Sequence, residues 1–172
     1  EGYTHILGGL EKDGETGSIS TDPENHDLMD HLRWDKVARI PVPDLKVLGD
    51  EADADLLIVG FGSTYGHLYS AMEELRRKGH KVALAQFKYV NPLPKNTPEV
   101  LARYKKVVVA EQNLGQLAAL LRIRINNFAP YQYNQVKGQP FVVSELVSTF
   151  EKLLKAPLPK EESGTFYTKI LQ

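Results

Sequence analysis

Short, fully apolar runs alternate with longer segments of helical period between residues 55 and 155. The apolar runs predict buried strands at residues 55–60, 81–87, 105–111 and 141–144. Segments with apolar positions three and four residues apart predict helices at residues 64–79, 97–104, 114–125 and 144–155. Strands that are apolar throughout are typical of a parallel sheet covered by helices on both faces. The predicted fold is therefore α/β, with three α/β/α layers around a mostly parallel sheet.

Capping residues mark where several of these helices begin. Thr97 and Ser144 each stand at the start of a predicted helix and are expected to be its N-cap. Asp22 followed by Pro23 predicts one more helix, over residues 23–40, because aspartate caps a helix and proline is tolerated in its first turn.

Composition divides the chain into three parts. Residues 1–45 begin with a loop rich in Gly, Thr, Ser and acidic side chains and hold one helix, which is the pattern of a linker segment. Residues 46–156 carry the α/β pattern, and residues 157–172 form a tail whose first part is a proline-containing linker. The first residue is Glu1 and no signal peptide is visible, so we expect the chain to be a piece of a longer protein.

Charge and cysteine content exclude several classes of function. The net charge is −1, so no overall field favours nucleic acid or an anionic membrane. The apolar runs are too short to span a bilayer. The chain has no cysteine, which excludes a disulfide scaffold, a thiol nucleophile and a cluster held by its own thiolates. This composition fits a cytoplasmic protein.

Three glycines, Gly60, Gly62 and Gly66, follow the first buried strand with the spacing G-x-G-x-x-x-G. The dinucleotide fingerprint is G-x-G-x-x-G, with an acidic residue near the end of the second strand. In this chain the second strand ends in Gln86 and Phe87. The glycines are therefore expected to serve backbone geometry and not a dinucleotide.

Polar residues near the predicted carboxyl ends of two strands are weak candidates for binding a cofactor. Ligands of α/β domains bind at this edge, and a helix N-terminus there can accept an anion. The candidates are Ser63, Thr64, Glu111, Asn113 and Gln116. The alternative for Asn113 is a plain helix cap.

No catalytic residue and no metal site are expected on this chain. His26 and His31 lie five residues apart, whereas a metal-binding pair on one helical face needs a spacing of three or four.

Four motifs, in order, resemble a known family: GFGSTYG, NPLPKN, VVVAEQNLGQLAALLR and VKGQPFVVSEL. Together they resemble the C-terminal part of the α subunit of 2-oxoacid:ferredoxin oxidoreductases, most of all the 2-oxoglutarate type. The resemblance runs from about residue 3 to residue 155. It implies a fold like the transketolase C-terminal domain, which in that superfamily mainly organises subunit packing.

The resemblance also implies what the whole enzyme contains. The family cleaves a 2-oxoacid on thiamine diphosphate, passes electrons through iron–sulfur clusters to ferredoxin and hands the acyl group to coenzyme A. The pyrimidine-binding domain is expected upstream of Glu1, and the diphosphate motif with its magnesium ligands is expected on the β subunit. This chain is then expected to hold no cofactor and to be inactive alone. The expected partners are the β subunit, a second α chain and, through the complex, ferredoxin.

An interface with those partners is expected on the helix at 114–125 and the segment at 128–139. The helix is apolar around most of its circumference, and the segment presents aromatic residues in what is expected to be an irregular loop. The candidate interface residues are Leu117, Leu121, Tyr131, Tyr133 and Lys137.

Two alternatives stay open. A free-standing nucleotide- or coenzyme A-binding module of flavodoxin-like shape predicts that the isolated chain binds a ligand. The chain could also be the C-terminal domain of another thiamine enzyme, such as a dehydrogenase E1 β subunit.

Overall fold

The computed structural model describes residues 7–158, which fall into two compact units, one ending at Val42 and one beginning at Pro43. The predicted tail falls almost wholly outside the described residues.

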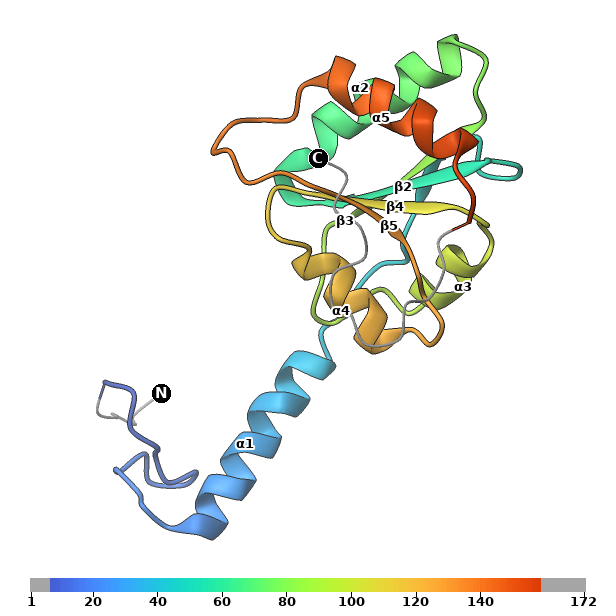
Figure 1. The fold of residues 1–172 in the computed structure, drawn as a ribbon. Helices are drawn as coiled ribbons and strands as arrows, with labels where there is room; N and C mark the ends of the chain where they lie inside the picture. The colour runs from blue at the N-terminus through green and yellow to red at the C-terminus, as the bar shows by residue number, and fades with distance from the viewer. Residues whose placement is uncertain (1–6, 159–172) are drawn as a thin grey trace. The chain divides into compact units, whose positions relative to one another are not determined.

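The second unit is built on a five-stranded sheet with the strand order β1-β3-β2-β4-β5 (Figure 1). Strands β2, β3, β4 and β5 run parallel to one another, and β1 runs antiparallel to β3 at one edge. The strands are β1 (Val47–Gly49), β2 (Leu56–Phe61), β3 (Val82–Phe87), β4 (Val107–Glu111) and β5 (Tyr131–Asn134). The predicted α/β fold with a mostly parallel sheet is confirmed.

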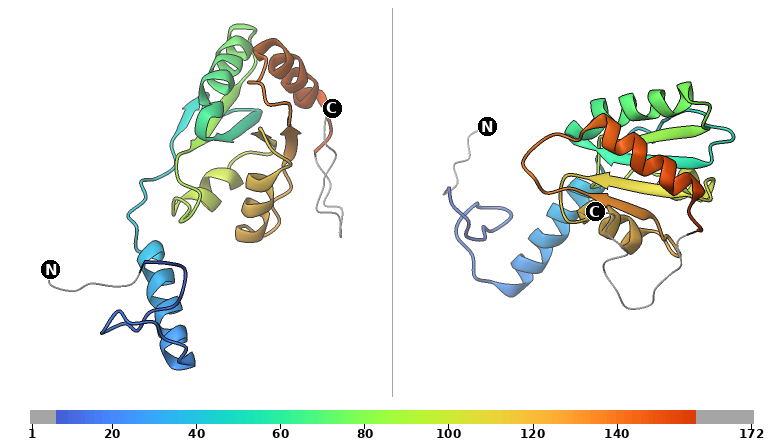
Figure 2. Two further views of the ribbon diagram at one scale, coloured as in Figure 1. Left: turned by 90° about the vertical axis from the view of Figure 1, so that its left-hand side faces the viewer. Right: turned by 45° about the horizontal axis from the view of Figure 1, so that its top comes forward.

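Helices cover both faces of this sheet (Figures 1 and 2). Two of them, α2 (Tyr65–Arg77) and α5 (Val143–Lys155), pack together on one face, and α2 follows a short 3₁₀ turn, η1 (Gly62–Thr64). The opposite face carries α3 (Thr97–Ala102) and α4 (Gln116–Arg124). Alternate residues of β2 enter the two resulting cores, because successive side chains of a strand point to opposite faces.

The predicted strand at residues 141–144 is wrong. Val142 is exposed, and α5 already begins at Val143. The last strand is instead β5, inside the segment that was expected to be irregular. Tyr133 of this strand packs edge-on against Phe141, so Phe141 reaches the core from a loop.

Helix starts were predicted with mixed success. Asp22 caps its helix as expected, because its side chain accepts a hydrogen bond from the backbone N–H of Glu24. Thr97 is not a cap but the first residue of α3, and its hydroxyl donates to the Pro94 carbonyl at 2.6 Å. Ser144 lies in the first turn of α5, whose cap position is occupied by Val142.

Lys106, next to the start of β4, binds the C-terminal end of α5. Its ammonium group donates to the carbonyl oxygens of Leu153, Leu154 and Ala156 at 3.3, 2.6 and 2.7 Å. The last carbonyls of a helix have no partner within the helix and carry partial negative charge. Lys106 therefore fastens the C-terminal end of α5 to the edge of the sheet.

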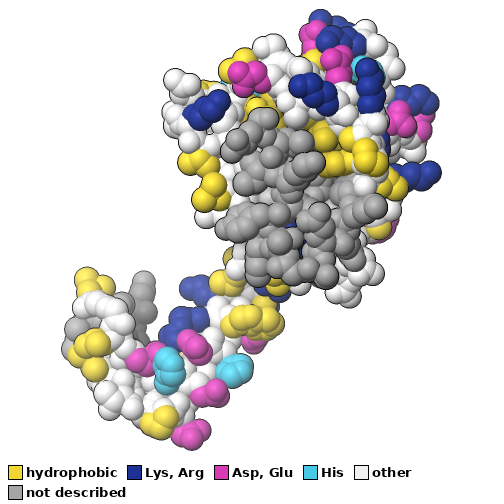
Figure 3. Space-filling model, viewed as in Figure 1, with side chains coloured by type: hydrophobic (Ala, Val, Ile, Leu, Met, Phe, Trp, Pro, Cys, Tyr) yellow, Lys and Arg dark blue, Asp and Glu magenta, His cyan; other side chains and the backbone are white. Residues whose placement is uncertain are grey.

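The first unit consists of α1 (Pro23–Ala38) and the loop before it. The buried Asn25 joins them: its side-chain oxygen accepts from the N–H of Gly14 at 3.1 Å, and its side-chain nitrogen donates to the Lys12 carbonyl at 2.9 Å. Arg33 donates two hydrogen bonds of 3.1 Å to the Glu11 carboxylate. These are polar contacts, and Figure 3 shows apolar side chains left on the surface of this unit.

Among the described residues, no helix combines the length and the apolar character that crossing a bilayer would require.

The Glu11–Arg33 contact makes a prediction about pH. The hydrogen bonds from Arg33, and next the one from His26, lower the pKa of Glu11 from 4.5 to about 2. Because the pKa of the folded state is the lower one, this contact stabilises the unit above about pH 4.5 and is lost as the pH falls through about 2. An NMR titration of the Glu11 side chain should have its midpoint near pH 2.

Arg33→Met should raise that midpoint toward 4.5. Arg39→Met is the matched control, because Arg39 pairs with Asp35 elsewhere on α1. A Glu11 midpoint that stays the same in Arg33→Met would contradict the contact.

Candidate functional site

The predicted cofactor candidates all lie where parallel strands end. Ser63 and Thr64 follow β2, and Glu111, Asn113 and Gln116 lie at or after the end of β4. Strands β2 and β4 are direct neighbours in the sheet, so both groups belong to its carboxyl edge.

Glu111, the last residue of β4, is completely buried. Its Oε2 accepts from the backbone N–H of Leu117 at 2.6 Å, and its Oε1 accepts from that of Ala118 at 2.9 Å. The first N–H groups of a helix lack partners within the helix and form its positive end. Both carboxylate oxygens are therefore engaged in capping α4.

Asn113 completes this cap. Its side-chain oxygen accepts from the N–H of Gly115 at 2.7 Å and from that of Gln116 at 2.9 Å. Gly115 has a φ of 96°, and a Cβ there would lie 2.4 Å from Oε1 of Gln132, so a side chain does not fit. The side chains of Glu111 and Asn113 thus take up four successive N–H groups at the start of α4.

The loop after β2 is packed against its neighbours, but the helix that follows it has no side-chain cap. The Thr64 hydroxyl is buried and donates to the carbonyl of Phe61 at 2.8 Å. A Cβ on Gly60 would lie 2.3 Å from Cδ1 of Leu68, so this glycine lets α2 approach the sheet. Gly62 has a φ of 60°, a backbone conformation that favours glycine. Gly66 has neither constraint, because its φ lies outside the left-handed region and a Cβ there would meet nothing within 4 Å. Backbone geometry accounts for the first two glycines and not for the third.

Three polar side chains at the same edge were not singled out from the sequence. Gln86, Asn134 and Gln135 each have a buried side-chain oxygen without a hydrogen-bond partner among residues 7–158. Gln86 uses its side-chain nitrogen to donate to the Gly62 carbonyl at 3.1 Å. A glutamine inside an apolar strand was the signal that could have pointed to this position.

The interface candidates lie partly inside the chain's own core. Leu117, Leu121 and Tyr133 are buried, the leucines between α4 and the sheet and the tyrosine against Phe150 of α5. These three side chains leave no surface for a partner, because they pack inside this chain, whereas Ile123 of α4 is 74% exposed. Tyr131 is half-buried and Lys137 is exposed, so these two remain as interface candidates.

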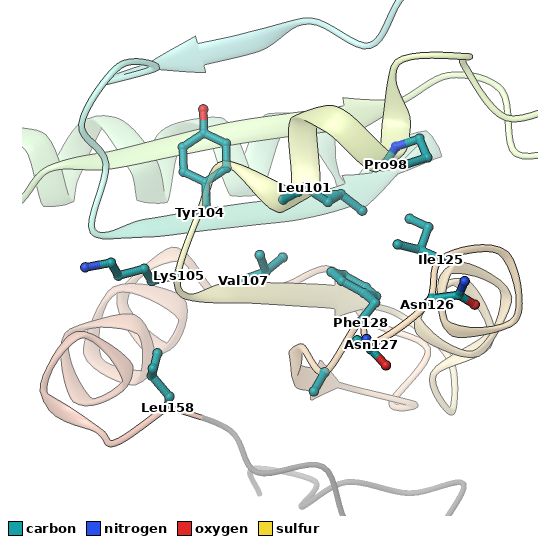
Figure 4. A pocket seen from close by; sticks show the side chains of 12 residues that line it. Pro98, Leu101, Tyr104, Lys105, Val107, Ile125, Asn126, Asn127, Phe128 and Leu158 are labelled. Carbon is teal, nitrogen blue, oxygen red and sulfur yellow. The ribbon is translucent and has the colours of Figure 1, made fainter.

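A cavity of about 330 Å³ opens at the opposite, amino edge of the sheet (Figure 4). It lies between α3 and the segment that follows α4. Its apolar lining is Pro98, Leu101, Val107, Ile125 and Phe128, with Asn126, Asn127 and Lys105 among the polar residues. Within residues 7–158, no group of three or more His, Cys, Asp or Glu side chains is placed to hold a metal ion.

Replacing Glu111 tests its role as a cap. Glu111→Gln turns one acceptor oxygen into a donor that faces a backbone N–H, so we expect the free energy of unfolding to fall by about 1–3 kcal/mol. Urea denaturation at neutral pH measures the change. Gln116→Ala, which removes an exposed side chain at the same helix start, is the control and should change it by under about 0.5 kcal/mol. Unchanged stability in Glu111→Gln would point instead to a role toward a ligand.

The glycines should respond in opposite directions to alanine. Gly60→Ala should cost about 1–3 kcal/mol, because its methyl group would overlap the Leu68 side chain. Gly66→Ala should gain about 0.4–1 kcal/mol, because the position is open and lies in the first turn of α2. Thermal unfolding of both variants checks this. Equal effects would show that the loop is not packed as described.

Comparisons with known proteins agree with this geometry. Residues 54–145 match the family described as pyruvate:ferredoxin oxidoreductase core domain II. The chain is 47% identical over 145 residues to the 2-oxoglutarate oxidoreductase subunit KorA of Mycobacterium tuberculosis, covering 84% of this chain and 22% of the relative. It is 32% identical to subunit alpha of 2-oxoacid:ferredoxin oxidoreductase 2 of Aeropyrum pernix, covering 88% of this chain and 24% of that subunit. The chain thus spans about a quarter of the length of these relatives.

Solved structures support the same assignment. The 2-oxoglutarate:ferredoxin oxidoreductase of Magnetococcus marinus, solved with 2-oxoglutarate, coenzyme A and succinyl-CoA, matches with a TM-score of 0.72 and 33% identity. The match covers 88% of this chain and 27% of that one. A split-gene transketolase matches with a TM-score of 0.50 and 18% identity, which shows the shared fold alone. The family resemblance drawn from the sequence motifs is confirmed: the chain belongs to the pyruvate:ferredoxin oxidoreductase core domain II family.

Proposed function

We propose that this chain is an assembly domain, without catalytic residues of its own, of the α subunit of a 2-oxoacid:ferredoxin oxidoreductase. The substrate proposed for the whole enzyme is 2-oxoglutarate. The observation that carries the proposal is the 47% identity over 84% of this chain to a subunit named for 2-oxoglutarate. The reaction proposed for the whole complex yields acyl-CoA, CO₂ and reduced ferredoxin.

The polar groups of the domain favour an assembly role. Ligands of a parallel sheet bind at its carboxyl edge. Here the side-chain oxygens of Glu111 and Asn113 accept hydrogen bonds from the start of α4. The described residues also supply no set of metal ligands. These residues do not fit a site for thiamine diphosphate with its magnesium ion, or for an iron–sulfur cluster, so the proposal assigns these cofactors to other parts of the complex.

The same contacts weigh against a free-standing nucleotide- or coenzyme A-binding module. Such a module binds phosphate with free N–H groups at a helix start. At α4 the first four are engaged, and the loop before α2 has the wrong glycine spacing. We place the domain beside a β subunit and a second α chain in the cytoplasm, with ferredoxin as the electron acceptor of the complex.

A chimera tests the proposal. The matching part of the Mycobacterium tuberculosis KorA subunit is replaced by this chain, and 2-oxoglutarate-dependent reduction of ferredoxin is measured in the assembled enzyme. We expect activity within about tenfold of the parent. The subunit with the matching part deleted is the control and should fail to assemble. This chain alone should show no turnover.

Turnover by the isolated chain would overturn the assembly role, because it would place catalytic groups on this domain. A chimera that does not assemble would overturn the assignment to an α subunit of this type.

A further inference from the structure

The carboxyl edge of the sheet leaves large hydrophobic side chains in solvent. Each of the four parallel strands is followed, within four residues, by one such side chain: β3 by Tyr89, β2 by Tyr65, β4 by Leu114 and β5 by Val136. Their exposed fractions are 44%, 43%, 63% and 65%. The strands are neighbours in this order, about 4.8 Å apart, so the four side chains stand along one edge of the second unit (Figure 1).

Charge is almost absent from this edge. Residues 62–65, 112–115 and 135–142, which follow β2, β4 and β5, hold a single charged side chain, that of Lys137. At the amino edge, residues 50–55, 78–81 and 103–106 hold four acidic side chains and five of lysine or arginine. Permanent interfaces are the more apolar ones, and charged residues are depleted at their centre. The carboxyl edge therefore has the composition of a covered surface, whereas the amino edge has that of a surface facing water.

Unpaired polar atoms lie at the same edge. Gln86, Asn134 and Gln135 each have a buried side-chain oxygen that accepts no hydrogen bond from residues 7–158. Gln135 is only 9% exposed, and it directly precedes the exposed Val136. A buried acceptor without a donor destabilises the fold, so a covering surface that supplies N–H or O–H groups is favoured here.

The length of the relatives narrows the choice of that surface. The matched part makes up 22% of the Mycobacterium tuberculosis KorA subunit and 27% of the matched Magnetococcus marinus chain. If this chain is part of such an α subunit, the rest of the subunit is joined to it covalently and is present at a high effective concentration. A mobile electron acceptor would instead be steered by charged surfaces, which this edge lacks.

We propose that the carboxyl edge, defined by residues 62–65, 88–90, 112–115 and 135–142, packs permanently against the rest of its own α subunit. The inference rests on the proposed function and names the surface that fixes the domain within the subunit. Leu114 and Val136 form its apolar centre, because they are the most exposed of the four hydrophobic side chains. Donors of the covering surface meet the free oxygens of Asn134 and Gln135 beside them.

Photo-crosslinking in the assembled enzyme tests which partner covers the edge. The chimera described above, in complex with its β subunit, carries a benzophenone amino acid at position 136. After irradiation we expect peptide pairs that join position 136 to parts of the α subunit outside this chain, in a band with the mass of one α subunit. The control is the same probe at position 123 of α4, where Ile123 is 74% exposed, and it should give no such pair.

Charge substitutions test the surface itself. In the isolated chain, Leu114→Glu and Val136→Glu should each change the midpoint of thermal unfolding by under about 2 °C, because both side chains are exposed there. In the chimera the two together should speed amide hydrogen exchange in residues 135–142 at least about tenfold, because a carboxylate is costly to bury and the contact opens. Ile123→Glu is the matched control and should leave the exchange rate unchanged.

Crosslinks from position 136 to the β subunit, to a second α chain or to residues 1–42 of this chain overturn the proposal, because each is a different occupant. The absence of any crosslink overturns it too, since the edge would then face water. So does a fall of more than about 5 °C in the isolated chain, which would give these side chains a role in its own fold. An active chimera with any of these results refutes this contact alone, whereas a chimera that does not assemble refutes the proposed function and this contact together.

Discussion

The hydrogen bonds between Glu111 and the start of α4 are the contact on which the rest of the second unit depends. A carboxylate is costly to bury unless hydrogen bonds and favourable charge surround it. Here two backbone N–H groups and the positive end of a helix supply both. The helix is thereby fixed to the end of strand β4, and Asn113 takes the two remaining N–H groups.

This contact decides that Glu111 and Asn113 serve the fold and are not free to bind a ligand. In many α/β domains the polar residues at the carboxyl edge of the sheet are free to bind a ligand. In this chain Glu111 and Asn113 hold the start of α4 there, whereas three other buried side-chain oxygens at the same edge, those of Gln86, Asn134 and Gln135, have no partner among residues 7–158. Lys106 fastens α5 near the amino edge. Fold alone does not specify function, so the use of this edge is read from its contacts. Glu111, Asn113 and Lys106 thus fix two helices to the sheet.

Strong local signals made most of the fold predictable. The apolar runs at 55–60, 81–87 and 105–111 correspond to β2, β3 and β4, and Asp22 before Pro23 marked the start of α1. Strand β5 was missed because its sequence YQYN has few apolar residues, and its burial comes from Phe141 and Phe150, which are distant in sequence. Strand β1 has three residues, too few to show a period.

The sequence by itself determined the layered α/β architecture, the family and the absence of cysteine chemistry, because these follow from periodicity, motifs and composition. It also placed Glu111 and Asn113 beside a helix start. Only the tertiary structure decided what Glu111 does, since a carboxylate at a strand end serves a ligand or a helix according to the path of the next few residues. The same holds for Gly60 and Tyr133: one is required by a Leu68 side chain from α2, and the other is buried by α5. Side chains acquire such roles from neighbours that the chain brings close only when it folds.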